Sequence, residues 1–192
     1  MSANENSNLS DVIQELQLAD EIIKEGIADT MDMYGGNRSV GQIYAILYMN
    51  GGPMTLDELR DETGMSKGSM SLGVRKLLDD KIIHKVFKRG ERKDLYQAEA
   101  DFFQFFSSFF TKRWQREVSV NVHAVKQAQP KYQKILDHPD STEQERSEAE
   151  RKLNKITDSL KYYEFLDVMV DEFQSGDFIH YINEKYNITN EK

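Results

Sequence analysis

The apolar residues of this chain recur mainly at intervals of three and four positions, the period of amphipathic α-helices. A first helix is predicted from about Ser10 until Gly35 and Gly36 end it in YGGNRS, and residues 1 to 8 are predicted to be disordered. The apolar side of this helix carries Val12, Leu16, Ile23, Ile27 and Met31. After Met31 the helical period returns in shorter segments.

Three short helices and a hairpin are predicted next. Ser39 is expected to cap VGQIYAILYMN, Thr55 to cap LDELRDET with Glu58 at capping-box distance, and Ser66 to cap a helix to about Asp80. IIHKVFK and RKDLYQA then favour β-strands, joined by a charged turn around Gly90. This order is typical of a winged helix-turn-helix.

The rest of the chain is predicted to be helical. A long helix is expected from about residue 101 to 126, ended near Pro130, and a second from Ser141 or Thr142 to about Gln174. A last helix covers roughly residues 177–186. The predicted fold is therefore mainly α with a small β-hairpin wing, a winged helix-turn-helix core flanked by helical dimerisation arms.

The stretch GMSKGSMSLGVRKLLDD is unusual because its helix begins with glycines and serines, and each glycine costs about 1 kcal/mol of helix propensity. Its apolar face, predicted to point inward, carries Met70, Val74, Leu77 and Leu78. The opposite face carries Gly68, Ser69, Leu72, Arg75 and Lys76. Small residues allow a close approach to a DNA major groove, and leucine suits a thymine methyl group. The stretch is therefore interpreted as a recognition helix, the alternative being a marginal surface helix with accidental glycines.

Charge is concentrated at the same place. The chain has a net charge of −8, yet the segment 66–93 holds nine basic and three acidic residues, a net charge of +6. A basic island in an acidic protein indicates a localised contact with a polyanion. The predicted DNA-binding residues of helix and wing are Ser66, Lys67, Gly68, Ser69, Ser71, Leu72, Arg75, Lys76, Lys88, Arg89, Arg92 and Lys93.

Other chemistry is excluded or unsupported. The chain has no cysteine, and its four histidines lack ligand spacing, so no metal site is predicted. There is no P-loop, GxGxxG or nucleophile elbow, so neither an enzyme nor a cofactor is predicted. No apolar run approaches the roughly 18 residues of a membrane span, and the N-terminus lacks the order of a signal peptide. A cytoplasmic protein without a membrane partner is expected.

The run MYGGNRSVGQIYAILYMNGGPMTLDELRDETGMSKGSMSLGVRKLLDDKIIHKVFKRGERKDLYQAE closely resembles the DNA-binding core of GbsR-type regulators, a branch of the MarR superfamily. The resemblance continues through DFFQFFSSFFTKRWQREV and covers roughly residues 30–130, with 53–96 its specific part. It implies a dimeric repressor, bound to operator DNA, that controls glycine betaine synthesis or choline uptake. Choline or a related quaternary ammonium would relieve the repression.

Three regions follow from this interpretation: an N-terminal arm and dimerisation helix (1–36), a winged helix-turn-helix DNA-binding domain (37–99), and a helical ligand-sensing and dimerisation region (100–192). Homodimer contacts are expected from the N- and C-terminal helices. The C-terminal stripe comprises Ala149, Leu153, Ile156, Leu160, Tyr163 and Val170. Intramolecular packing onto the 101–126 helix would produce the same stripe.

FFQFFSSFFTKRW has seven aromatic residues in thirteen, spread over half the helix circumference. Most are expected in the core or a dimer interface, but aromatic faces also hold quaternary ammonium groups. The predicted aromatic box comprises Tyr44, Tyr48, Tyr96, Phe110 and Trp114, for choline or glycine betaine. Two alternatives stay open: a regulator with a different small apolar effector, and a winged-helix module that binds proteins instead of DNA.

Overall fold

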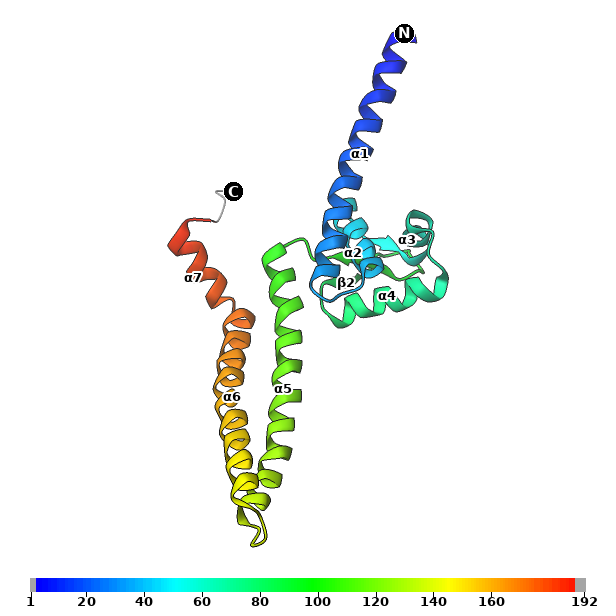
Figure 1. Cartoon of the computed structure of the whole chain (residues 1–192). Coiled ribbons are helices and arrows are strands. Elements are labelled where there is room, and N and C mark those ends of the chain that lie inside the picture. The colour runs from blue at the N-terminus through cyan, green and yellow to red at the C-terminus, as the bar shows by residue number, and fades with distance from the viewer. Residues whose placement is uncertain (1–2, 189–192) are drawn as a thin grey trace. The chain divides into compact units, whose positions relative to one another are not determined.

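The computed structural model describes residues 3–188 of the chain, with side chains from residue 11 onward (Figure 1). It forms two compact units, one ending at Phe105 and the other beginning at Phe106. The first contains α1 (Ala3–Met33), α2 (Arg38–Asn50), β1 (Met54–Thr55), α3 (Leu56–Thr63), α4 (Lys67–Asp79), β2 (Ile83–Val86) and β3 (Leu95–Ala98). The second contains most of α5 (Phe102–Asp137), together with α6 (Glu143–Ser175) and α7 (Asp177–Tyr186).

Helices α2, α3 and α4 with a small sheet form the winged helix-turn-helix that the pattern predicts. The caps of α3 and α4 are confirmed: Thr55 and Glu58 form a capping box, and the Ser66 hydroxyl accepts from the backbone N–H of Ser69. Gly64 ends α3 with a positive φ of 67°, which glycine adopts without strain. The tight junction between α3 and α4 follows from these local signals.

The predicted hairpin is confirmed as β2 and β3, which pair antiparallel with Lys85 opposite Tyr96. A third strand joins them, because Met54 pairs with Tyr96 from the other side and gives the order β1-β3-β2. A two-residue strand is too short to show an alternating pattern, so β1 could not be predicted. This strand fixes the wing to the start of α3, since Thr55 belongs to both the strand and the cap.

The core of the first unit is apolar and contributed by every helix of the winged fold. Its largest fully buried side chains are Ile43, Tyr44, Leu47, Leu59, Met70, Leu77 and Ile82. The inward face of α4 is confirmed for Met70, Val74 and Leu77, while Leu78 is half-buried. Helix α2 crosses α1 in backbone contact, since a Cβ on Gly41 would lie 2.9 Å from the Ala28 Cα. No larger residue fits at position 41.

Three predicted boundaries are wrong. Helix α1 begins at Ala3 where disorder was predicted to residue 8, because no proline or glycine interrupts the segment 3–9. Asn37, instead of Ser39, caps α2, and its side chain accepts from the Ser39 N–H. Helix α5 continues through Pro130 to Asp137.

The continuation through Pro130 has a local cause. A proline removes one helical hydrogen bond and clashes with the carbonyl four residues earlier, here that of Lys126. Both Pro130 and Lys126 are exposed, so water can solvate the freed carbonyl. Contacts to α6 on the other side hold the helix together, including Gln129 donating to the Thr157 hydroxyl at 3.3 Å.

Helices α5 and α6 run side by side as a hairpin (Figure 1). Its turn is held by Arg146, whose guanidinium donates to the carbonyls of Leu136, His138 and Ser141. Thr142 and Glu145 form a capping box at the start of α6. Close packing at the other end is marked by Ser107, whose hydroxyl donates to the Phe173 carbonyl at 2.7 Å.

The α6 stripe predicted for dimer contacts is covered in part within the chain. Ala149 and Val170 are 3% and 2% exposed in a single protomer, and Leu153, Ile156, Leu160 and Tyr163 are half-buried. A long helix lacking a neighbour would leave this stripe in solvent, and α5 supplies that neighbour. Intramolecular packing, the alternative that gives the same pattern, accounts for the burial of Ala149 and Val170.

Candidate functional site

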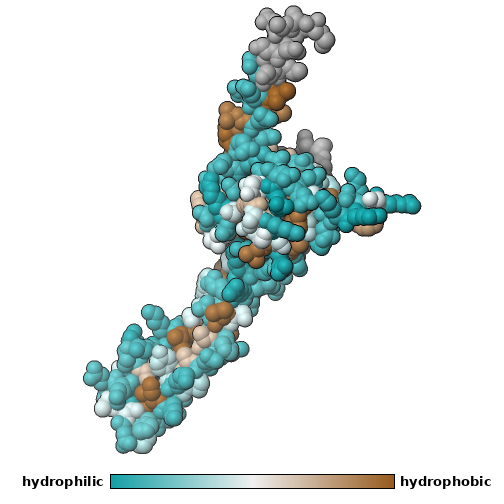
Figure 2. Space-filling model, turned by 90° about the vertical axis from the view of Figure 1, so that its right-hand side faces the viewer, coloured by the Kyte–Doolittle hydropathy of each residue, from teal (hydrophilic) through white to brown (hydrophobic). Residues whose placement is uncertain are grey.

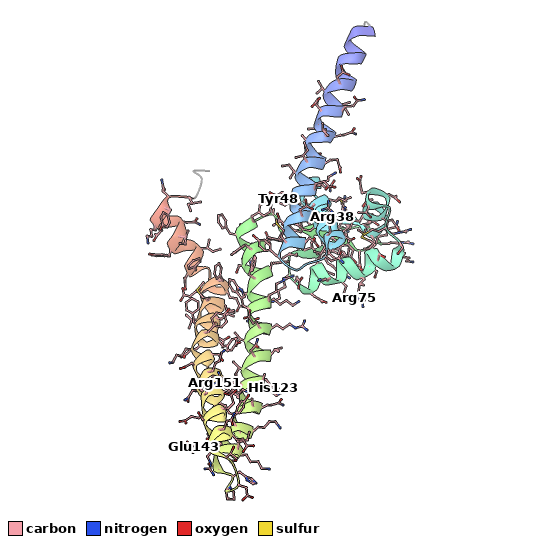
Figure 3. All side chains as sticks on the ribbon, in the orientation of Figure 1. Arg38, Tyr48, Arg75, His123, Glu143 and Arg151 are labelled. Atoms are coloured by element: carbon pink, nitrogen blue, oxygen red, sulfur yellow. The ribbon has the colours of Figure 1, made fainter. Side chains whose placement is uncertain are left out.

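The outer face of α4 is free of packing. Leu72 is 69% exposed, and Lys67, Gly68, Ser69, Arg75 and Lys76 are also exposed, whereas Ser71 is half-buried. Arg75 projects from α4 (Figure 3). The Ser66 hydroxyl, which already accepts from the Ser69 N–H, also donates to the Ser69 Oγ at 3.0 Å. The N-terminal end of the helix therefore presents small hydroxyl groups, and the following turns present one apolar and two basic side chains.

The two glycines of α4, Gly68 and Gly73, occur for different structural reasons. At Gly68 an added Cβ would meet nothing closer than the Ser66 Oγ at 4.0 Å, so this side of the helix is open. At Gly73 it would lie 2.5 Å from the Cδ1 of Ile43, a residue of α2 that is 1% exposed. Gly73 is thus a packing glycine that lets α2 and α4 approach, and only Gly68 remains available for an outside partner.

We expect opposite effects from alanine at the two glycines. Gly68→Ala should stabilise the fold by up to about 1 kcal/mol through helix propensity while weakening any contact made through this face. Gly73→Ala should destabilise it by about 1–2 kcal/mol, because the cost of overpacking exceeds the propensity gain. Urea unfolding of both variants measures this difference.

The Gly73→Ala change in an Ile43→Val background is the matched control, since valine lacks the Cδ1 atom that the new methyl group meets. Destabilisation that persists unchanged in this background would show that Ile43 is not the residue that requires glycine at position 73.

The wing carries the second group of predicted residues. Lys88, Arg89 and Arg92 are exposed, and none of them forms an ion pair with another residue in the described part of the chain. Lys93 differs, because its ammonium donates to Asp57 on α3 at 2.7 Å. This contact raises the pKa of Lys93 and lowers that of Asp57. Lys93 therefore ties the wing to α3 and contributes less free positive charge than its neighbours.

The five residues of the predicted aromatic box are divided between the two units, with Tyr44, Tyr48 and Tyr96 in the first and Phe110 and Trp114 in the second. Tyr44 is fully buried in the first unit, its ring 4.7 Å from that of Phe105 and its hydroxyl donating to the Glu99 carbonyl. Burial raises the Tyr44 pKa well above its usual range, so the phenol stays protonated. Tyr48 stacks on Tyr44 at 6.1 Å. Tyr96 lies in the sheet, with the Lys85 ammonium 5.8 Å from its ring centroid.

Phe110 and Trp114 belong to an aromatic cluster within the second unit. Trp114 lies 5.6 Å from Phe110 and 5.4 Å from Phe173, measured between ring centroids. The aromatic cluster comprises Phe106, Phe110, Trp114, Phe173 and Phe178. Only Phe173 is buried, and Phe106 is 37% exposed, so the cluster is open on one side. Its rings come from α5, α6 and α7.

Two of these rings were missed from the sequence. Phe173 and Phe178 stand about sixty residues after Phe110, too far along the chain for helical spacing to relate them to it. They lie beside the Trp114 cluster because α6 folds back along α5. A cation on an aromatic face already occurs nearby, since the Arg113 guanidinium lies 3.3 Å from the Phe109 ring centroid.

The arrangement of α3, α4 and the three-stranded sheet defines a winged helix-turn-helix protein of the kind that binds DNA. A solved structure titled as that of a transcriptional regulator shares the fold, with a TM-score of 0.53 and 15% sequence identity over 82% of this chain and 99% of its own. Between residues 3 and 188, no helix is long and apolar enough to cross a membrane.

Relatives with known names identify the family. The chain is 43% identical over 167 residues to the HTH-type transcriptional repressor GbsR of Bacillus subtilis, covering 87% of this chain and 92% of that protein. The repressor OpcR of the same organism is 37% identical over 87% of this chain and 90% of its own. Residues 102–180 match the C-terminal helical hairpin of GbsR family transcriptional regulators. The chain belongs to the GbsR family, which comprises regulators and not enzymes.

Proposed function

We propose that this protein is a transcriptional repressor that binds double-stranded operator DNA with α4 in the major groove and the wing along the backbone. The observation that carries the proposal is the exposed face of α4, where Leu72 at 69% exposure lies between small residues and Arg75. An exposed leucine is unfavourable in water and favourable against a thymine methyl group. Family membership supports the same function, since GbsR and OpcR are repressors by name.

The basic residues of α4 and those of the wing are proposed to contact different parts of the DNA. Arg75 and Lys76 follow the small residues of α4, where they can reach base edges or phosphates. Lys88, Arg89 and Arg92 lie on the turn between β2 and β3, where backbone contacts are expected. Base contacts specify a sequence, whereas phosphate contacts add affinity that falls with salt.

Two arginine variants test this division. Arg75→Ala should weaken operator binding by about 1–3 kcal/mol and relax the preference at one base position. Arg89→Ala should weaken operator and random DNA alike and reduce the slope of log K against log salt by about one. Binding titrations at several salt concentrations measure both effects.

Identical behaviour of the two variants would show that helix and wing are wrongly assigned. A wild-type protein whose binding to its upstream DNA does not depend on salt would favour the protein-interaction module instead.

We infer that the repressor is a homodimer joined through α1. Exposed apolar side chains cover this helix: Val12, Ile13, Leu16, Leu18, Ile22 and Ile23. Hydrophobic patches are visible along α1 in Figure 2. An apolar groove of about 410 Å³ continues them, lined by Ile22, Ile23, Gly26, Ile27, Thr30, Met31, Phe102 and Phe105. A contiguous exposed apolar surface of this kind marks an association site, and a two-fold dimer would match a palindromic operator.

For the effector, we propose choline or glycine betaine, bound by the aromatic cluster. Quaternary ammonium groups cannot donate hydrogen bonds and are held by ring faces, tryptophan being the strongest. The cluster offers Trp114 together with Phe106, Phe110 and Phe178, which are exposed or half-buried, packed against the buried Phe173. The matched C-terminal hairpin contains all five residues. The regulated genes would be those of glycine betaine synthesis or choline uptake, an assignment that rests on the resemblance to GbsR-type regulators. A different small apolar effector would be indicated if neither compound bound.

A further inference from the structure

The side chain of Phe87 is the most exposed large apolar side chain in the described part of the structure, at 90%. It follows directly after β2, which ends at Val86, and precedes the turn of the wing. Surface phenylalanines are usually folded back onto an apolar neighbour, but no ring contact involves Phe87 among the described residues. A ring held in solvent at the end of a strand is a candidate for contact with a partner.

The surroundings of Phe87 show which kind of partner fits. Lys88, Arg89 and Arg92 lie on the adjoining turn and are exposed. Two acidic residues lie between β2 and β3. Asp94 pairs with the Lys85 ammonium at 2.7 Å, and Glu91 accepts from the backbone N–H groups of Arg92 and Lys93, at 3.0 and 3.1 Å. The Glu91 carboxylate thus stabilises the turn that displays the three cations. The partner must be a polyanion that also offers an apolar surface to a flat ring.

Duplex DNA meets both requirements. Proteins that enter the minor groove often insert an apolar side chain between base pairs while basic residues hold the phosphates on either side. The fold places Phe87 on the wing of a winged helix-turn-helix, so the partner of α4 and the partner of Phe87 would be the same molecule.

We propose that Phe87 is a minor-groove wedge, stacking against or between base pairs beside the half-site that α4 reads, with Arg89 and Arg92 on the flanking phosphates. The proposal rests on the proposed DNA-binding function. It adds a source of selectivity that no base-edge contact supplies, because unstacking costs least at flexible pyrimidine–purine steps such as TA and CA. Operators with such a step at the wing position would bind more tightly than operators with a stiff A-tract there.

Phe87→Ala is the direct test. The probe is the duplex that footprinting defines on the DNA upstream of the gene for this chain, with 2-aminopurine placed in turn at each position outside the half-sites. The wild-type protein should raise the fluorescence at one step in each half, and Phe87→Ala should abolish that rise. Affinity should fall about tenfold, the scale of one lost base–aromatic contact, with the salt slope unchanged.

Two further variants make the outcome specific. Phe87→Leu keeps an apolar wedge and should retain most of the fluorescence rise. Lys88→Ala removes a neighbouring charge and should reduce the salt slope while leaving the fluorescence rise in place.

The proposal is overturned if Phe87→Ala binds the duplex like the wild type, or if its loss of affinity comes with dissociation of the dimer in sedimentation. Wild-type protein that binds the duplex tightly without any fluorescence rise would also overturn it. Failure of the wild type to bind any upstream duplex is a separate result, since it would contradict the DNA-binding function itself.

Discussion

Replacing Ile22 by aspartate should convert the protein from a dimer to a monomer at micromolar concentration and weaken operator binding on the order of 100-fold or more. Ile22 is 63% exposed on α1 and lines the apolar groove. In a dimer through this face, each protomer would bury a carboxylate without a partner, which is strongly unfavourable. A monomer then loses the gain of binding two half-sites at once, commonly a factor of 10²–10⁴.

Sedimentation velocity and operator titration on the same samples measure the two effects together. Gln17→Asp is the matched control: it adds the same charge to an exposed polar position of α1 and should leave both properties unchanged. A wild-type protein that sediments as a monomer at micromolar concentration would refute the dimer, and a dimeric Ile22→Asp variant would move the interface away from this groove.

Trp114→Ala should leave operator binding intact while raising the choline concentration needed for release roughly 30-fold, since one good ring in a desolvated site contributes about 2 kcal/mol. Trp114 is half-buried and packs on Phe110 and Phe173, so its removal deletes one wall of the aromatic cluster without emptying the core. It is also the only tryptophan of the chain. Choline titrated into the wild type should therefore change the intrinsic fluorescence directly.

Phe165→Ala is the control for this variant, because Phe165 is an aromatic residue of α6 at 59% exposure that lies outside the cluster. It should preserve both the fluorescence change and release. If Trp114 were a structural core residue only, alanine would cost about 3–5 kcal/mol of stability and would impair folding and DNA binding together. If a well-folded Trp114→Ala protein dissociated from operator DNA at the wild-type choline concentration, Trp114 would be excluded from the binding site.

Most of the fold could be predicted because its signals are local. The caps at Thr55, Ser66 and Thr142, the glycine ends at Gly64 and Gly176, and the change of period before β2 each depend on a few neighbouring residues. The inward face of α4 was likewise readable from helical spacing. The features that could not be predicted depend on contacts between residues far apart in the sequence. Gly73 and Gly68 are alike in sequence, and only the position of Ile43 separates their roles.

The predicted aromatic box shows the same limit more strongly. Aromatic abundance in 102–114 predicted that rings would gather, but the partners of Trp114 were sought in α2 and β3. The structure gives Tyr44 to the core of the first unit and supplies Phe173 and Phe178 to Trp114. A sequence shows how many aromatic rings a segment contains. Which rings contact Trp114 depends on how α6 folds back along α5. The DNA-binding residues stay predictions of the sequence, now with defined exposure.

The backbone contact between α1 and α2 has a mechanical consequence. Because Gly41 of α2 packs directly against Ala28 of α1, the helix that would join two protomers is held firmly against the helix-turn-helix. In a dimer built this way, the distance between the two α4 helices would be fixed before DNA binds. An operator lengthened by one base pair would present its second half-site rotated by about a tenth of a turn, and the protein could not swivel to follow it. Selectivity for spacing would then be set by two small residues far from any base.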